Sequence, residues 1–580
     1  MKLLRYGEMR GVAMSIAVGA ALLLSSICAE AVTLHRGNGA EPDSLDPDKA
    51  QGTWENHIIG DMLLGLYTED AAGKAIYGAA ESHKVSQDGL VWTFKLRDHT
   101  WSDGVPVTAD DFITAWRRIL DPAFHGQYAS LLYEFKNARD INEGRMKPEE
   151  LAARAIDAKT IELTLDHPAP YLPQLLAHQT AFPVPKHVLD AKGDQWVKAG
   201  NYVSNGPYTL TAWSPNNYIL LKKNPRFYDA ANVQIDEIYY YPTSDTSAAF
   251  KRFRAGELDM QDGLSSQDID FIKQNIPDTL HLNPNLSVSY IAINSSKPPL
   301  NDKRIREALS LAFDRDTMAE KILKFEEQAA YSFVPPGTAG YPGGVNLDFK
   351  PLSYEERVAK AKGLMEAAGY GPQNVLHLRF EIGTAPDNKR VGAAIQQMWR
   401  PIYVDVEPRG SESQVLYAQL RAGDFQVSQA AWVGDYNDAK NFLFLFRTDT
   451  KDMNYGRYSN PEFDRLMLQS DSMVDEVERG KVLAQAETIM LNDYACITNR
   501  FINGRHIVQT YVKGFVPNIR DVNRSRFLRV ERPSGMTNSG PTAAGPAGAT
   551  DSTLQQEQSW WDWFTSLLCS WFGIACPTGS

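Results

Sequence analysis

The sequence has few cysteines and lacks the motifs that usually accompany catalysis. Its 580 residues include four cysteines, too few for a disulfide framework, and only Cys569 and Cys576 lie near enough in sequence to suggest a local disulfide. The patterns G-x-S-x-G, S-x-x-K, H-E-x-x-H, G-x-x-x-x-G-K-[ST] and C-x-x-C do not occur. The 11 histidines are scattered, with no pair at helical spacing to hold a metal ion. We therefore predict no catalytic residue, no metal site and no cofactor.

Concentrated positive charge is also missing. The formal net charge is −12, and the basic residues are dispersed along the chain. Binding to nucleic acid requires a basic face that neutralises phosphates, so we predict that this protein has no nucleic-acid partner.

The N-terminus has the pattern of a secretory signal peptide. Three basic residues precede an apolar run at 11–27, and the small-residue sequence Ala29-Glu30-Ala31 follows it. The apolar run is short for a membrane span. We predict that residues 1–31 form a cleaved signal peptide. Cys28 follows Ile27, where lipoprotein signals carry a small residue, so we expect no lipid anchor.

Strand and helix patterns alternate through most of the chain. Residues 160–165 and 375–382 alternate apolar and polar side chains, which is typical of half-buried strands. A capping box at 353–356 precedes a helix that stops at Gly369, and Asn460-Pro461 begins another helix. This interleaving predicts an α/β protein with open mixed sheets.

The composition changes near the C-terminus. Residues 533–558 are rich in Pro, Gly, Ser, Thr and Ala and predict a flexible linker. In the tail at 559–580, large apolar side chains recur at helical spacing, which predicts an amphipathic helix too short to span a bilayer. The tail has no Lys or Arg, unlike most helices that lie in a membrane interface. Docking onto protein and lying on a membrane surface both stay open for it.

The stretch "AWVGDYNDAKNF" at 431–442 places two carboxylates, Asp435 and Asp438, in one aromatic turn. A calcium loop of the EF-hand type would need a ligand at Ala439 and a glycine at Lys440. Acid–base pairs usually converge from different elements instead of sharing one turn. We interpret Asp438 as a loop or helix-capping residue. Two roles remain for Asp435: binding a charged group of a ligand, or stabilising the turn through hydrogen bonds.

Six stretches spread over the chain carry a resemblance to a known family. They are "LVWTFKLRDHTWSDGVPVTADDFITAW" at 90–116, "SNGPYTL" at 204–210, "LKKNPRFYD" at 221–229, "LNDKRIREALSLAFDR" at 300–315, "AKGLMEAAGYG" at 361–371 and "WVGDYND" at 432–438. In order and spacing they resemble the solute-binding proteins of peptide ABC importers, in particular the periplasmic oligopeptide-binding and dipeptide-binding proteins. No single stretch is decisive, but the set is specific.

The resemblance implies an α/β fold of the type II periplasmic-binding-protein class. This fold is a two-lobed clamshell with mixed sheets, two hinge strands and an extra domain inserted in the first lobe. It implies that the ligand is buried between closing lobes without catalysis, and that the loaded protein docks on permease subunits in the inner membrane. The signal peptide would place the mature chain in the periplasm. The expected boundaries are 32–63, 188–289 and 503–532 for lobe I, 64–187 for the inserted domain and 290–502 for lobe II, with hinges near 287–293 and Phe501.

The resemblance also assigns ligand-binding residues. Asp435 matches an Asp that binds the α-ammonium group of a peptide, and a buried carboxylate facing an ammonium forms a charge-assisted hydrogen bond. The three residues at 431–433, and a second segment on the other lobe, are expected to pair with peptide backbone, which is independent of side chains. Phe501 stands where a Tyr is common. The remaining matched positions are Ala431, Trp432, Val433, Gln51, Gly52, Thr53 and Tyr128.

The sequence departs from the family at the far end of the ligand. Positions that carry Arg or His for peptide carboxylates are here Asn388, Leu420 and Gln429. A pocket-lining Trp is replaced by Ser413, and Arg421 is a candidate substitute for the missing cation. The ammonium-binding position is kept while the carboxylate-binding positions are not. This pattern fits longer peptides, modified C-termini or a non-peptide amine.

The sequence thus predicts a periplasmic binding protein for oligopeptides. Three alternatives stay open. The same fold could bind a non-peptide compound such as a metal chelate, haem, opine, sugar or peptide-like antibiotic. The protein could act as a ligand sensor, which the aromatic tail alone favours. A secreted hydrolase would need a catalytic constellation that the sequence does not contain.

Overall fold

The computed structural model describes residues 31–533. The predicted signal peptide up to residue 30, and the predicted linker and tail from residue 534 onward, lie outside the described residues. The Cys569–Cys576 pair therefore lies outside them as well. Within the described part, Cys496 is buried as a free thiol.

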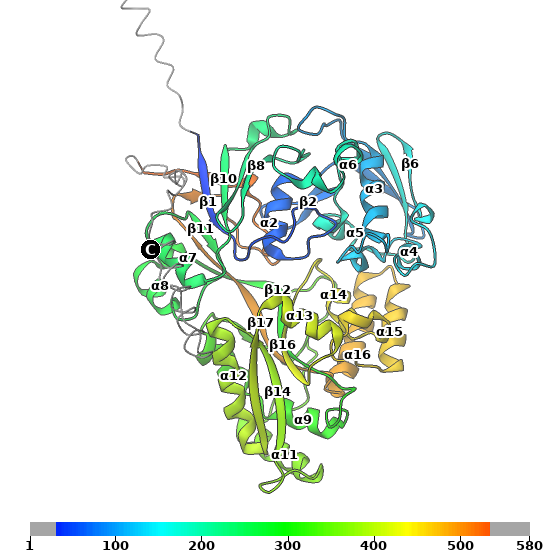
Figure 1. The fold of residues 1–580 in the computed structure, drawn as a ribbon. Helices are drawn as coiled ribbons and strands as arrows, with labels where there is room; N and C mark the ends of the chain where they lie inside the picture. The colour runs from blue at the N-terminus through cyan, green and yellow to red at the C-terminus, as the bar shows by residue number, and fades with distance from the viewer. Residues whose placement is uncertain (1–30, 534–580) are drawn as a thin grey trace, which may run out of the picture. The chain divides into compact units, whose positions relative to one another are not determined.

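One large sheet runs through the described chain (Figure 1). Its two longest strands, β12 (Leu280–Ile293) and β17 (Cys496–Val508), are antiparallel neighbours near the middle. On one side of them lie β16 (Val427–Val433), β14 (Leu376–Gly383) and β15 (Val404–Ser411). On the other side lie β11 (Met260–Asp262), β1 (Thr33–Gly37), β10 (Glu237–Tyr241), β9 (Tyr218–Lys223) and β8 (Tyr208–Ser214), while β13 (Gln328–Ala329) pairs with β17.

The two strands β12 and β17 connect the two halves of the molecule. Val288 of β12 lies opposite Phe501 of β17, so the two predicted hinge segments are direct neighbours. The register shifts between Pro284 and Val288 and again between Ser289 and Tyr290. Such bulges locally bend a strand and increase its twist. The two-lobed α/β fold with two hinge strands is thus the one that the sequence predicted.

The second half of the sheet contains the patterns that were clearest in the sequence. Leu376, Leu378, Phe380 and Ile382 of β14 are buried, as their alternation predicts. The predicted capping box is present at the start of α11 (Tyr354–Ala367), and Gly369 beyond it has a φ of 91°. The predicted helix at Asn460 is α15 (Pro461–Asp471), with the Asn460 side chain as its cap. The other helices of this half are α9 (Lys303–Leu311), α10 (Arg315–Thr317), α12 (Pro386–Trp399), α13 (Ser413–Ala422), α14 (Lys440–Leu443) and α16 (Glu476–Asn492).

A separate four-stranded sheet falls within the predicted inserted domain, at 64–187. Its order is β4 (Ala80–Val85), β5 (Val91–Leu96), β7 (Thr160–Thr164) and β6 (Ala153–Asp157), and β7 is the predicted strand at 160–165. The core under it includes the fully buried Trp101 and Trp116. The boundaries of this domain stay a prediction. The neighbouring elements are the hairpin of β2 (Tyr67–Glu69) and β3 (Ala75–Tyr77) and the helices α3 (Ala109–Leu120), α4 (Ala138–Asn142) and α5 (Leu172–Leu175).

The remaining elements accompany the first half of the large sheet. They are the helices α2 (Thr53–Met62), α6 (Lys186–Lys192), α7 (Thr246–Arg254) and α8 (Ile269–Asn275) and the short hairpin of β18 (Val512–Lys513) and β19 (Arg529–Val530). Among residues 31–533, every helix is too short or too polar to cross a membrane.

A buried histidine joins β17 to the first half of the sheet. His506 Nδ1 lies 2.8 Å from Asp262 Oδ1, and its Nε2 lies 2.7 Å from Asp521 Oδ1. Burial acts to lower the pKa of His506, but the carboxylates of Asp521 and Asp262 outweigh it and raise the pKa to about 10. The imidazolium is therefore a structural cation that both carboxylates need.

We predict that His506→Gln lowers the free energy of unfolding by on the order of 3 kcal/mol at pH 6. Because the folded-state pKa is raised, this stabilisation is complete below the unfolded pKa of about 6.5 and is lost as the pH rises through about 10. Urea unfolding at pH 6, 8 and 10 measures the difference. The exposed His377→Gln is the control, and a His506 difference that stays constant from pH 6 to 10 would contradict the assignment.

Candidate ligand-binding site

The strand that precedes Asp435 has one edge that other strands leave open. Along its whole length β16 pairs with β12, from Val427 opposite Ile293 to Val433 opposite Ser287. On its other edge β14 pairs only with Val427 and Ser428. In the described part of the chain no strand pairs with residues 429–433 on that edge. An extended ligand can add there as a further strand, because unpaired N–H and C=O groups form a template.

The Asn441 side chain makes three hydrogen bonds to the end of β16 and the turn after it. Its Oδ1 accepts hydrogen bonds from the Asp435 N–H at 2.8 Å and from Trp432 Nε1 at 3.1 Å. Its Nδ2 donates to Asp435 Oδ2 at 3.1 Å. A Cβ at Gly434 would come 2.9 Å from the Phe442 ring, so the tight packing of the turn requires glycine. The Asp435 carboxylate is thereby fixed in position.

Tyr128 reaches Asp435 from the predicted inserted domain. Its hydroxyl donates to Asp435 Oδ2 at 2.5 Å, so two predicted site residues that are far apart in sequence meet directly. Burial raises the pKa of Tyr128 far above its ordinary value, and the Asp435 carboxylate raises it further. The phenol therefore stays protonated and acts as a hydrogen-bond donor.

The Asp435 carboxylate is largely buried without a cation. Its side chain is 11% exposed, and no Lys or Arg among residues 31–533 lies within ion-pair distance of it. The nearest basic group is His178, whose Nε2 lies 3.8 Å from Asp435 Oδ1. Burial, with Arg520 and Arg524 nearby, lowers the pKa of His178 to about 3, so this imidazole is neutral. Arg520 donates to the backbone carbonyls of Gly434 and Asp435 instead of the carboxylate.

The consequence for Asp435 is a raised pKa. Burial is the main cause, and the hydrogen bonds from Tyr128 and Asn441 offset it only in part. A buried carboxylate is stable when it is paired, and the described residues supply hydrogen bonds and the more distant charge of Arg520 but no ion pair with Lys or Arg. The site therefore has an unmet electrostatic demand, which a cationic ligand group satisfies.

The segment at 51–53, which was expected to pair with ligand backbone from the other lobe, has fewer free backbone groups than the sequence suggested. The N–H groups of Gln51 and Gly52 both donate to Glu55 Oε2, at 3.2 and 2.7 Å, and α2 begins at Thr53. The Gly52 carbonyl accepts from the Asn56 N–H at 3.1 Å. Pairing of this segment with ligand backbone stays a prediction, which now rests mainly on the Gln51 carbonyl. The Gln51 side chain donates to Gln127 Oε1 at 2.6 Å, beside Tyr128.

The far end of the site is neutral where the family has cations. Gln429 Nε2 donates to Asn388 Oδ1 at 2.7 Å, so these two predicted residues meet. Gln429 Oε1 is buried without a hydrogen-bond partner among the described residues. Leu420 is fully buried in the core and presents nothing to a ligand. Phe501 lines a cavity of about 310 Å³, together with residues of the loop at 332–346.

Two predicted interpretations of the turn need refinement. Trp432 was expected to form an aromatic wall for the ligand, but its ring is buried and packs edge-on against Phe444 at 5.4 Å. Asp438 was interpreted as a loop or capping residue, and it does accept from the Lys440 N–H at 2.8 Å. It also forms a buried ion pair with Arg479 at 2.5 Å. No sequence pattern indicates Arg479, His178 or Arg520, whereas Asn441 lies within the stretch at 431–442.

The model of the family described as bacterial extracellular solute-binding proteins, family 5 middle, matches residues 74–454. The chain belongs to this family. It is 35% identical over 511 residues to the periplasmic oligopeptide-binding protein OppA of Escherichia coli (strain K12), covering 86% of this chain and 93% of that protein. Haemophilus influenzae OppA in complex with RPPGFSPFR superposes with a TM-score of 0.81 at 33% identity, covering 87% of this chain and 99% of the other.

Two structures of the murein tripeptide-binding protein MppA superpose on this chain with different TM-scores. This chain superposes on one, from Escherichia coli, with a TM-score of 0.82 at 33% identity, covering 87% of this chain and 99% of that chain. The TM-score falls to 0.69 against the form described as unliganded and open. The Tyr128–Asp435 hydrogen bond across the site is consistent with this difference.

We predict that Asp435→Asn stabilises the ligand-free protein, raising its melting temperature by roughly 1 to 3 °C at pH 7. Because burial raises the folded-state pKa, the charged form opposes folding above that pKa, and the gain shrinks as the pH falls through it. Asn retains the oxygen that accepts from Tyr128 and Asn441. Calorimetry of protein stripped of ligand measures the shift, with the exposed Asp424→Asn as control. A lower melting temperature for Asp435→Asn would contradict an unpaired carboxylate.

Proposed function

We propose that this protein is the non-catalytic, periplasmic solute-binding component of an ABC importer, and that its ligands are oligopeptides with a free α-ammonium group. The observation that carries the proposal is the buried Asp435 carboxylate, with which no Lys or Arg among residues 31–533 forms an ion pair. A peptide N-terminus supplies the missing charge together with N–H groups for hydrogen bonds. Asp435 would bind the ammonium, and Tyr128 and Asn441 would hold the carboxylate in place.

The open edge of β16 supports a peptide over a simple amine. A chain bound at Asp435 can continue along residues 429–433 and pair its backbone there. Every peptide offers the same backbone groups, so this pairing gives affinity with little dependence on sequence. The Gln51 carbonyl would add a contact from lobe I. The similarity to OppA and MppA, named for oligopeptide and murein peptide binding, agrees with this ligand class.

Delivery to a membrane permease follows from closure. The lobes enclose the ligand, and the closed form presents a surface that an open form lacks, which allows the permease to select the loaded protein. The predicted signal peptide would place the protein in the periplasm, where such a cycle operates. We propose no role for the C-terminal tail.

A second candidate ligand class is an amine whose far end is uncharged. The observation that favours it is the neutral Asn388–Gln429 pair at 2.7 Å, together with the burial of Leu420. A ligand carboxylate placed beside this pair would meet two amides. A long peptide, a modified C-terminus or a peptide-like compound suits such a surface.

Mass spectrometry of the material that the purified protein releases on denaturation separates these classes. We predict a mixture of oligopeptides with free N-termini. A single non-peptide molecule would refute the peptide proposal and leave the fold assignment intact.

Calorimetry tests the role of Asp435 directly. We predict that Asp435→Asn weakens the binding of free-amine peptides at least about tenfold, because one partner of a buried charged pair is removed. Binding of the same peptides with acetylated N-termini should change little, since they carry no ammonium. Equal losses for both peptide forms would refute the ammonium role.

A further inference from the structure

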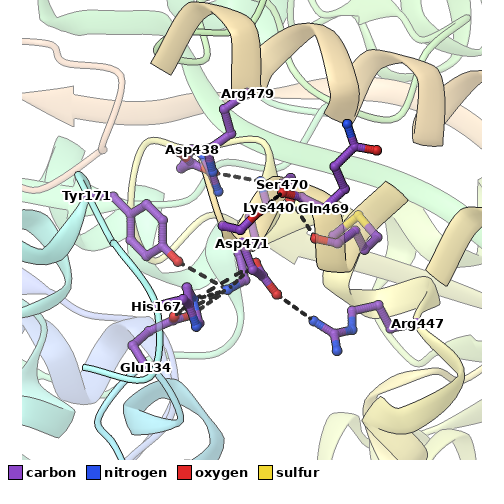
Figure 2. Close-up of polar contacts among 12 residues, drawn as sticks. Glu134, His167, Tyr171, Asp438, Lys440, Arg447, Gln469, Ser470, Asp471 and Arg479 are labelled. Carbon is purple, nitrogen blue, oxygen red and sulfur yellow. Dashed lines mark hydrogen bonds and ion pairs between the residues drawn. The ribbon is translucent and has the colours of Figure 1, made fainter. Parts of the chain in front are cut away.

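Lys440, five residues beyond Asp435, contacts residues of both halves of the molecule (Figure 2). Its side chain is 7% exposed. The ammonium lies 3.0 Å from Glu134 Oε1 and 2.8 Å from Asp471 Oδ1. It also lies 2.9 Å from His167 Nε2 and 3.2 Å from the Tyr171 hydroxyl. Glu134, His167 and Tyr171 belong to the predicted inserted domain, whereas Asp471 ends α15 in predicted lobe II.

The cluster leaves little access to water. The side chains of Glu134 and Asp471 are 10% and 12% exposed. Burial alone would raise the pKa of Glu134, but Lys440 and then His167 outweigh it and hold the pKa well below its ordinary value. Asp471 also pairs with a second cation, Arg447, which belongs to the same predicted lobe. The Arg447 Nη1 atom lies 3.1 Å from Asp471 Oδ2. Lys440 is thus the cation that separates two carboxylates brought together from the two halves.

The same turn contacts the inserted domain at three further points. Asp435 accepts from Tyr128, and the ring of Tyr436 stacks on Tyr171 with centroids 4.5 Å apart. The Asn437 N–H donates to Gln174 Oε1 at 2.7 Å. These contacts are hydrogen bonds and ring stacking, whereas the contact of Lys440 is between opposite charges. Residues 435–440 therefore form one surface against the inserted domain. The ion pair of Lys440 lies at one end of this surface, and the Asp435 carboxylate lies at the other.

We propose that Lys440 is a positioning residue that couples lobe closure to ammonium binding at Asp435. This inference rests on the proposed function. In the closed arrangement Lys440 joins Glu134, and the turn that carries Asp435 is fixed against the inserted domain. When the lobes separate, Lys440 keeps Asp471 while Glu134 returns to water with His167. Without Lys440, closure brings Glu134 and Asp471 together as like charges, and among the described residues only His167 Nε2 lies within ion-pair distance of both.

This geometry predicts a specific order among variants. Lys440→Met disfavours closure most, because it leaves two facing carboxylates. Glu134→Gln disfavours it less, since the amide oxygen still accepts from Lys440. The double variant Glu134→Gln/Lys440→Met regains part of the closed population, because one of the two carboxylates is neutralised. A residue with a merely structural role would show additive effects.

The test measures the distance between the lobes with spin labels at Ile156→Cys and Val474→Cys, in a secreted chain with Cys569→Ser and Cys576→Ser. Both label sites are exposed and lie on opposite sides of the predicted boundary. Distances are recorded for the free protein and with the nonapeptide RPPGFSPFR, the probe ligand. Arg118→Met is the matched control, because it breaks a buried pair with Asp46 and Asp48 away from the turn. It should lower the unfolding free energy and leave the distances unchanged.

We expect Lys440→Met to lower the short-distance population at least about tenfold, with partial recovery in the double variant. The affinity for the nonapeptide should fall in parallel, mainly through faster dissociation. Unchanged distances for Lys440→Met in both the free and the peptide-treated protein, or additive effects of the two substitutions, would overturn the proposal. Failure of the wild-type protein to bind the nonapeptide would count against the proposed function alone. The distances in the ligand-free variants would still test whether Lys440 stabilises the closed arrangement.

Discussion

The hydrogen bond from Tyr128 to Asp435 joins the two sides of the site, and no Lys or Arg of the described chain forms an ion pair with this carboxylate. The hydrogen bonds from Tyr128 and Asn441 fix where the charge lies, and burial makes that charge costly until a cation arrives. In this arrangement the carboxylate is held in place, so a ligand ammonium supplies an ion pair with it that no Lys or Arg among residues 31–533 forms.

The large sheet provides the mechanical basis for this site. β12 and β17 cross between the halves, and β16 rests on β12 along its whole length, so the open edge of β16 is attached to the hinge itself. A change in the angle between the halves moves Tyr128, Gln174 and Glu134 relative to the turn at 435–440. Closure and the completion of the site are therefore one event.

Local pattern accounted for much of the fold and part of the site. The alternation in β14, the capping box of α11 and the Asn460 cap of α15 were readable because each depends on residues within one turn or one strand. Asp435 was found through resemblance, since an Asp in a turn has no unique chemistry of its own. The partners of the turn could not be predicted. Glu134 and Lys440 are separated by 306 positions, and no local pattern links them.

The burial of individual residues shows which of the matched positions can still contact a ligand. Leu420 stands at a family position for a ligand-binding cation, but it is a core residue here. The N–H groups of Gln51 and Gly52 donate to the Glu55 carboxylate and are not available to a ligand. These positions show that a matched residue keeps its role only if its surroundings leave the relevant atom accessible.

The most direct measurement of the central claim is the titration of the Asp435 carboxyl group by ¹³C NMR, in protein labelled at aspartate and with Asp435→Asn for assignment. In the ligand-free protein the pKa should lie above the ordinary value for Asp, because burial disfavours the charged form. With a free-amine peptide bound, the pKa should fall below that value, because the ammonium stabilises the carboxylate. The same pKa in both states would show that Asp435 does not bind the ligand's cation.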